Sequence, residues 1–212
     1  MEDSAIRSGR LILVPALITA VVTLLRLTGE RLEWSPVLFN RSAGGGLAVV
    51  GIVWLIPIFG VYFGLRLARA GERPSHVARA LGLVFLALVL IPAVAFGAAA
   101  MRVAPRPMVV AFSVASVVAV LVAVRAWPAL GRTLVIYGLA ARVPVAIVML
   151  LAMLGGWGTH YDAPTPGFPD MLPLTNWFWT GFLPQLTMWI AVTVVIGLLF
   201  GVPAAAIFHR ER

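Results

Sequence analysis

Residues 133–154 read TLVIYGLAARVPVAIVMLLAML, an apolar run interrupted by a single charged residue, Arg142. About 20 apolar residues, or as few as about 17, are enough for a helix to cross a bilayer. Inside lipid, every backbone N–H and C=O group must find its partner within the segment, so such a run is expected to be helical. We therefore predict a transmembrane helix over residues 133–154.

Similar apolar runs recur along the rest of the chain. They predict further spans at residues 11–27, 47–65, 80–101, 108–124 and 182–208. Continuous apolar runs such as residues 117–124 lack the alternation of apolar and polar residues that is typical of a membrane β-barrel. The predicted fold is all-α: a polytopic integral membrane protein whose residues 1–212 form one domain, a bundle of six transmembrane helices.

The composition supports a membrane environment. Of the 212 residues, 61% are hydrophobic and only 11% are charged, whereas a soluble domain carries about 25% charged residues. The formal charge of +8 comes from arginines dispersed between apolar runs, a pattern typical of membrane anchoring, so we expect no nucleic-acid partner. The absence of cysteine excludes disulfides, iron–sulfur clusters and thiol catalysis.

The distribution of arginines predicts the orientation. With six spans, one side of the membrane holds both termini and about twice as many arginines as the other, which places the termini in the cytoplasm. All basic residues are arginines, in a chain rich in Ala, Gly and Val, which suggests a bacterial gene and the bacterial cytoplasmic membrane. The cytoplasmic set is Arg7, Arg10, Arg66, Arg69, Arg73, Arg79, Arg125, Arg132, Arg210 and Arg212, and the external set is Arg26, Arg31, Arg41, Arg102 and Arg106.

A long external loop is predicted between the fifth and sixth helices. Prolines and glycines are frequent between residues 155 and 173, which disfavours a regular helix there. We predict that residues 171–181 form an interfacial piece before the last span, because Trp177, Phe178 and Trp179 are residues that favour the headgroup level.

Small residues mark the faces on which the helices are expected to pack. Gly60 and Gly64 recur four residues apart, and so do Gly197 and Gly201. Ala111, Ala115, Ala119 and Ala123 form a similar stripe. Such spacing lets membrane helices approach closely. We expect packing within the bundle, and the alternative is a homo-oligomer or a membrane-protein partner.

Arg142 is the sharpest functional signal, because an arginine at the centre of a span costs about 2.5–3.5 kcal/mol on insertion scales. No Asp or Glu lies within a predicted span. Three explanations remain open: Asp162 folds back from the loop, backbone carbonyls such as that of Ala140 and water satisfy the guanidinium, or an anion from outside the chain binds it.

The loop sequence WGTHYD, residues 157–162, supplies the second candidate site. His160 and Asp162 are candidate catalytic residues, a base and the group that orients it. They could also ligate a metal, but no third ligand is evident, so we predict no metal site and no cofactor. The candidate binding residues are Arg142, Tyr137, Gln185 and His160.

The sequence favours a non-enzymatic protein that transports or binds a small anionic solute or lipid within the helix bundle. One alternative is a structural or assembly subunit of a membrane complex, and a second is a membrane-embedded enzyme acting on a lipid. A proton-coupled carrier is disfavoured, because such proteins commonly use carboxylates within their spans.

Overall fold

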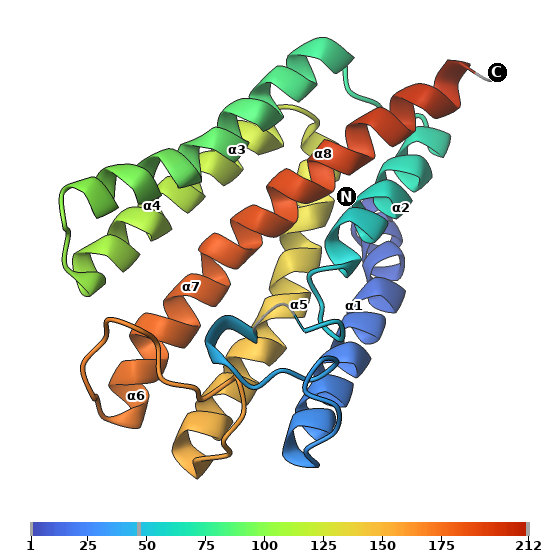
Figure 1. The fold of residues 1–212 in the computed structure, drawn as a ribbon. Helices are drawn as coiled ribbons and strands as arrows, with labels where there is room; N and C mark the ends of the chain where they lie inside the picture. Colours follow the sequence, from blue (N-terminus) through green and yellow to red (C-terminus); the bar gives the residue numbers. More distant parts are fainter. Residues whose placement is uncertain (1, 46–47, 211–212) are drawn as a thin grey trace.

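The computed structural model describes residues 2–45 and 48–210, and the side chains of residues 11–45 and 48–207. The predicted start of the second span, Leu47, lies outside these residues, as do Arg212 and the side chains of Arg7, Arg10 and Arg210. Within the described part, the chain forms helices and connecting loops without a β-strand (Figure 1). The all-α prediction is therefore confirmed.

Residues 2–45 and 48–210 form six helices and four short helical pieces. They are α1 (Glu2–Arg31), η1 (Ala43–Gly45), α2 (Leu55–Arg69), α3 (Val77–Ala100), α4 (Pro105–Val124), α5 (Pro128–Gly155), α6 (Pro173–Asn176), η2 (Trp177–Phe182), α7 (Leu183–Leu186) and α8 (Met188–Arg210).

Five of the described helical segments are long and apolar enough to cross a membrane. They are Leu11–Arg31, Val77–Ala100, Pro105–Val124, Pro128–Gly155 and Pro173–Ile207. Helix α2 has 15 residues, fewer than the roughly 17 that a span needs. These segments indicate an integral membrane protein, while the predicted count of six spans is not confirmed.

The predicted second span begins too early in the sequence. Residues 48–54 form turns instead of helix, and α2 runs from Leu55 to Arg69. The backbone N–H groups of Val49 and Val50 donate to the carbonyls of Val37 and Leu38, at 3.4 and 3.1 Å. Pairing with this earlier loop replaces the helical hydrogen bonds that the apolar composition predicted.

The last helix begins earlier than predicted. Residues 173–181, predicted as part of a separate interfacial piece, are helical and continue into α8. Pro173 occupies the first turn, where its missing N–H group has no helical partner to lose. Further along, η2 is a wide π turn and Thr187 departs from helical geometry, with φ −118° and ψ −73°. Pro184, which has no N–H group to give the preceding turn, lies between these irregularities.

Helix α8 is the centre of the bundle and packs against α2, α3, α4 and α5. A Cβ atom on Gly60 would lie 2.5 Å from the carbonyl oxygen of Gly197, and one on Gly64 would lie 2.6 Å from that of Gly201. The two predicted glycine faces therefore pack on each other within the chain, which confirms the expectation of internal packing. Ala115, Ala119 and Ala123 of α4 are also buried.

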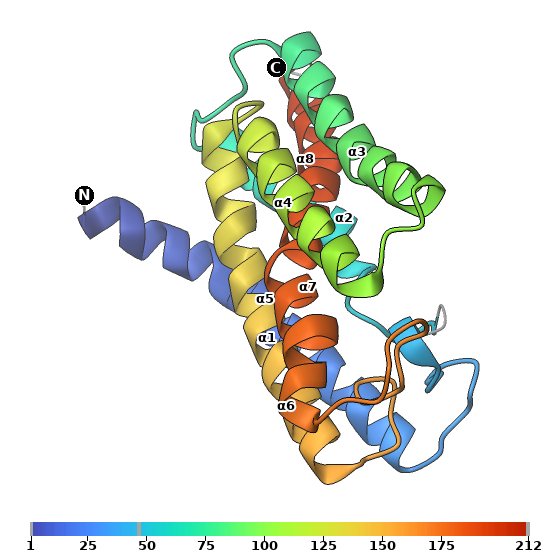
Figure 2. The same cartoon turned by 90° about the vertical axis from the view of Figure 1, so that its left-hand side faces the viewer.

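Large apolar side chains are exposed along the outer helices, as expected of surfaces that face lipid. Examples are Leu17, Val21, Phe85, Val89, Phe96, Val114, Leu121, Ile147 and Leu151. The C-terminus lies at one end of the bundle, and the N-terminal part of α1 projects from the side toward that end, while the loops 32–45 and 156–172 lie at the other end (Figures 1 and 2).

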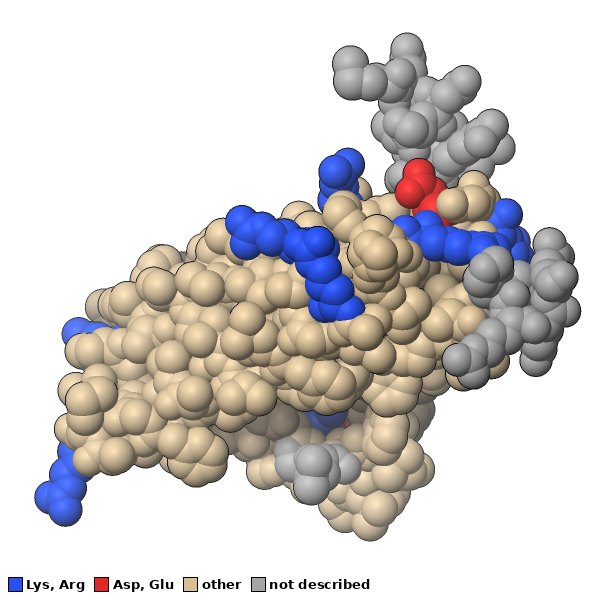
Figure 3. Space-filling view, turned by 90° about the horizontal axis from the view of Figure 1, so that it is seen from above, with Lys and Arg blue, Asp and Glu red and all other residues tan. Residues whose placement is uncertain are grey.

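Exposed arginines surround the end at which α2 finishes and α3 and α5 begin. Figure 3 looks toward this end and shows arginine side chains spread over it. Glu72 is the acidic residue in the connection between α2 and α3. The exposed arginines are Arg66, Arg69, Arg73, Arg79, Arg125 and Arg132.

Candidate functional site

Arg142 lies near the middle of α5 and points between α5 and α8. It is 4% exposed, and its guanidinium carbon lies 4.5 Å from the ring centroid of Trp189 on α8. A Cβ atom on Gly138, one turn before Arg142, would lie 3.6 Å from the Ile190 side chain. This is an ordinary van der Waals separation, so α5 and α8 are in normal packing contact here, and Trp189 lies over the arginine in a favourable cation–π arrangement.

The guanidinium of Arg142 has no hydrogen-bond acceptor among the described residues. Its Nε atom is buried without a partner, and the structure shows no ion pair or carbonyl bond to the side chain within that part of the chain. An arginine presents five N–H donors and stays charged at neutral pH. A buried cation whose donors are unused is the arrangement expected where an external acceptor binds.

Asp162 does not fold back onto Arg142. Its carboxylate accepts hydrogen bonds from the backbone N–H groups of Gly158 and Thr159, both at 2.8 Å, and from the Thr159 hydroxyl at 2.7 Å. Burial alone would raise the pKa of Asp162, but these hydrogen bonds outweigh it and lower the pKa from its ordinary value. Asp162 thus stabilises the 156–172 loop.

His160 is oriented by Glu30 and not by Asp162, which corrects the predicted base and orienter. The ring Nδ1 atom lies 2.6 Å from Oε1 of Glu30, and the backbone N–H of His160 donates to Oε2 at 2.8 Å. Burial lowers the pKa of His160, and the hydrogen bond to Glu30 offsets this only in part. A neutral ring that donates its Nδ1 proton to Glu30 leaves Nε2 as a proton acceptor.

Glu30 is fully buried at the end of α1 and organises this corner of the molecule. Nε of Arg26, one turn earlier, donates to Oε1 of Glu30 at 2.8 Å. The guanidinium of Arg26 also donates to the carbonyls of Asn40 and Gly45, and that of Arg41 donates to the Glu30 carbonyl. Glu30 therefore joins α1, the 32–45 loop and the 156–172 loop.

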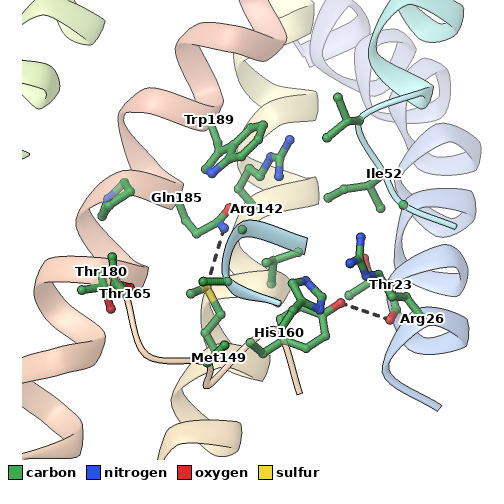
Figure 4. A pocket seen from close by; sticks show the side chains of 18 of the residues that line it. Thr23, Arg26, Ile52, Arg142, Met149, His160, Thr165, Thr180, Gln185 and Trp189 are labelled. Atoms are coloured by element: carbon green, nitrogen blue, oxygen red, sulfur yellow. Dashed lines mark hydrogen bonds between the residues drawn. The ribbon is translucent and has the colours of Figure 1, made fainter. Parts of the chain in front are cut away.

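A pocket of about 450 Å³ connects Arg142 and His160. Figure 4 shows Arg142, Gln185 and Trp189 on one side of it, with His160 and Arg26 on another. Much of the remaining lining is apolar, including Met149, Met153, Met188, Val145 and Ile52. Its volume is within the range of small-molecule sites, which combine apolar walls with a few polar groups.

Gln185 faces the pocket from α7, between the wide turn η2 and the irregularity at Thr187. Its Oε1 atom is buried without a hydrogen-bond partner. Its Nε2 atom contacts the sulfur of Met149 at 3.6 Å, a weak acceptor. The irregular helix thus presents a second polar side chain with unused hydrogen-bonding capacity close to Arg142, since both line the same pocket.

Three of the four predicted binding residues line this pocket: Arg142, Gln185 and His160. Tyr137 does not. Its hydroxyl bonds that of Thr19 at 2.8 Å, and its ring packs against Phe59 and Phe63 with centroids 5.4 and 5.5 Å away. Tyr137 therefore holds α1, α2 and α5 together in the core.

Sequence reasoning missed Arg26, Glu30 and Trp189. The predicted first span stopped at residue 27, whereas α1 continues to Arg31 and ends with a buried carboxylate. The spacing of four residues between Arg26 and Glu30 was the available signal, because it allows an ion pair on one helix face. Within the described residues, no three His, Asp or Glu side chains gather as a metal site requires.

Comparisons with known proteins do not assign the site: no protein-family model, curated protein or solved structure matches this chain. The functional argument consequently rests on the pocket itself.

Proposed function

We propose that this protein binds an anionic solute, or the anionic head of a lipid, in the pocket at Arg142, and that it serves membrane transport or ligand retention. The observation that carries the proposal is the buried Arg142 side chain, whose Nε atom has no partner and which lines a pocket. Asp162, one of the three partners that the sequence left open for Arg142, is engaged within its own loop.

The free-energy cost of burying the charged Arg142 favours binding of an anion at this site. Placing an arginine in the centre of a membrane helix costs about 2.5–3.5 kcal/mol on insertion scales. A planar guanidinium forms paired, charge-assisted hydrogen bonds with carboxylate, sulfonate-like or phosphate oxygens. Binding an anion would offset the cost of burying Arg142, and Gln185 would supply a further donor through its amide.

The proposed membrane arrangement has six crossings, with α2 as a short one that the loop 48–54 completes. Both termini would lie in the cytoplasm, because the exposed arginines of α2, α3, α5 and their connections lie at the end of the bundle that is nearer the termini. The pocket, which is lined by the loops 48–54 and 156–172, would then be nearer the external surface of a bacterial cytoplasmic membrane.

Native mass spectrometry of the detergent-purified protein tests the proposal. Wild type should retain an anionic lipid or solute, and Arg142→Leu should lose it. Arg132→Leu is the matched control: it removes the same charge from the same helix at an exposed position outside the pocket, so it should retain the ligand.

Flux measurements then separate transport from retention. Proteoliposomes containing wild type or Arg132→Leu should pass the anion identified by mass spectrometry, and those containing Arg142→Leu should not. A ligand that all three proteins retain equally would contradict the proposed role of Arg142. A ligand-free wild type that co-purifies with another membrane protein would instead favour a structural subunit.

A further inference from the structure

A proton-accepting nitrogen faces the same pocket as Arg142. Because Glu30 takes the Nδ1 position of His160, the ring offers Nε2 to its surroundings. Within the described residues, Nε2 has no hydrogen-bond partner. It is also not one of the fully buried polar atoms, so part of its surface is accessible. His160 lines the pocket together with Arg142 (Figure 4).

The charges around His160 come from three parts of the fold. Helix α1 supplies Glu30 and Arg26, the loop around His160 supplies Tyr161 and Asp162, and Arg142 of α5 lines the same pocket. Arg26 is neutralised by Glu30. The carboxylate of Asp162 is occupied by Gly158 and Thr159. Arg142 therefore contributes a positive charge to the pocket that no described side chain compensates.

We propose that the pocket takes up one proton with each monoanion that it binds, and that Nε2 of His160 accepts this proton. The inference rests on the proposed anion binding at Arg142. An anion beside Arg142 removes the uncompensated charge and places an acceptor in the pocket that His160 lines. Once the anion offsets the charge of Arg142, less positive charge opposes a protonated ring, and the hydrogen bond from Nδ1 to Glu30 remains. The charged form of His160 is therefore more favoured than in the anion-free pocket.

The same charge balance defines the ligand class. Arg142 is the single uncompensated cation among the described lining residues, which matches a head group with one negative charge. Met149, Met153 and Met188 give the pocket adaptable apolar walls. A carboxylate, sulfonate or phosphodiester head fits the charge, and its source is either a small free anion or an amphiphile with an apolar tail.

Calorimetric titration with two sulfonates tests the inference, because a sulfonate head remains a monoanion over the pH range used. Methanesulfonate represents a free small anion and octanesulfonate an amphiphile. Each is titrated into the protein in a non-ionic detergent at about pH 6 and about pH 8, which bracket the ordinary range of histidine. At an intermediate pH, the titration is repeated in two buffers with different heats of protonation.

Wild type should bind several-fold more tightly at the lower pH, with a limit of about tenfold per pH unit for one proton. The heats in the two buffers should differ by an amount that corresponds to uptake of up to one proton per anion. Stronger binding of octanesulfonate would identify an amphiphile as the source, and equal binding of methanesulfonate would identify a free anion.

His160→Asn should lose both the pH dependence and the buffer-dependent heat. His76→Asn is the matched control: His76 is exposed between α2 and α3 and does not line the pocket, so both signals should persist. Persistence of both signals in His160→Asn would overturn the assignment to His160. If that variant fails to fold, His160→Gln takes its place: loss of both signals in His160→Gln supports the assignment, and their persistence overturns it.

Different results would contradict the proton uptake and the anion binding. Wild-type binding with equal affinity at both pH values and equal heats in both buffers would overturn the proton uptake and leave anion binding intact. The absence of binding by either sulfonate at either pH would overturn both proposals.

Discussion

His160 Nδ1 lies 2.6 Å from Glu30 Oε1, across 130 residues of sequence, and Glu30 is fully buried. Glu30→Gln would leave Arg26 without its counter-charge while nearly preserving side-chain size. Removing one partner of a buried ion pair costs about 3–5 kcal/mol, so we expect a loss of this order, measured as a lower thermal midpoint in detergent.

Glu33→Gln is the matched control for Glu30. Glu33 is 77% exposed and forms a surface ion pair with Arg41 at 3.2 Å, and such pairs contribute less than about 1 kcal/mol. Its thermal midpoint should stay close to that of wild type. Equal effects of the two substitutions would contradict the organising role of Glu30.

Gly60→Ala should destabilise the contact between α2 and α8. The added Cβ would lie 2.5 Å from the carbonyl oxygen of Gly197, so the helices must separate, at a cost of about 1–3 kcal/mol. Gly82→Ala in α3 adds the same methyl group where nothing lies within 4 Å. Chemical or thermal unfolding should show a loss for the first variant only, and a neutral Gly60→Ala would disprove the close approach.

Arg142→Leu should raise the thermal midpoint of ligand-free protein, because it removes a buried charge that lacks an acceptor. The free energy of unfolding should increase by about 2 kcal/mol, less the contribution of the cation–π contact with Trp189 that is lost. Arg132→Leu, on the exposed surface of the same helix, should change stability by less than about 0.5 kcal/mol. A marked loss of stability in Arg142→Leu would show that the arginine is structural.

Stability should fall as the pH is lowered below about 6.5. Burial lowers the pKa of His160 from its ordinary value of 6.5 in the folded protein. The unfolded chain therefore binds a proton first as the pH decreases, and this favours unfolding until the folded state is protonated too. Thermal midpoints of the anion-free protein measured from about pH 8 to about pH 5 should decline in wild type and much less in His160→Asn; a rise toward acid in wild type would contradict the assignment.

The sequence was sufficient to predict most of the helices, because the apolar runs themselves decide where a membrane helix can form. The predicted spans 80–101, 108–124 and 133–154 correspond to α3, α4 and α5, which begin three to five residues earlier. The glycine faces of α2 and α8 were also recognised, because small residues at a spacing of four mark close packing. Their pairing with each other required the structure.

The sequence predicted only some of the residues that form the site. Arg142 was visible because a lone charge stands out within an apolar run, and the polar group of Gln185 stood out similarly. The Glu30–His160 contact joins the end of α1 to a loop 130 residues away, and no local pattern encodes that distance. The segment 48–54 was misassigned for the same reason, since its backbone bonds residues 37 and 38 rather than its own helix.

The central claim is that Arg142 binds an anion, and its Nε–H group offers the most direct measurement. Nitrogen-15-labelled arginine in wild type should give a side-chain Nε–H resonance that is absent from Arg142→Leu, which assigns it. Titration with methanesulfonate or octanesulfonate should shift this resonance saturably, because an anion bound to the guanidinium of Arg142, which lines the pocket, changes the charge next to its Nε–H group, while the Arg132 resonance stays in place. An Arg142 resonance that neither anion moves would contradict the account.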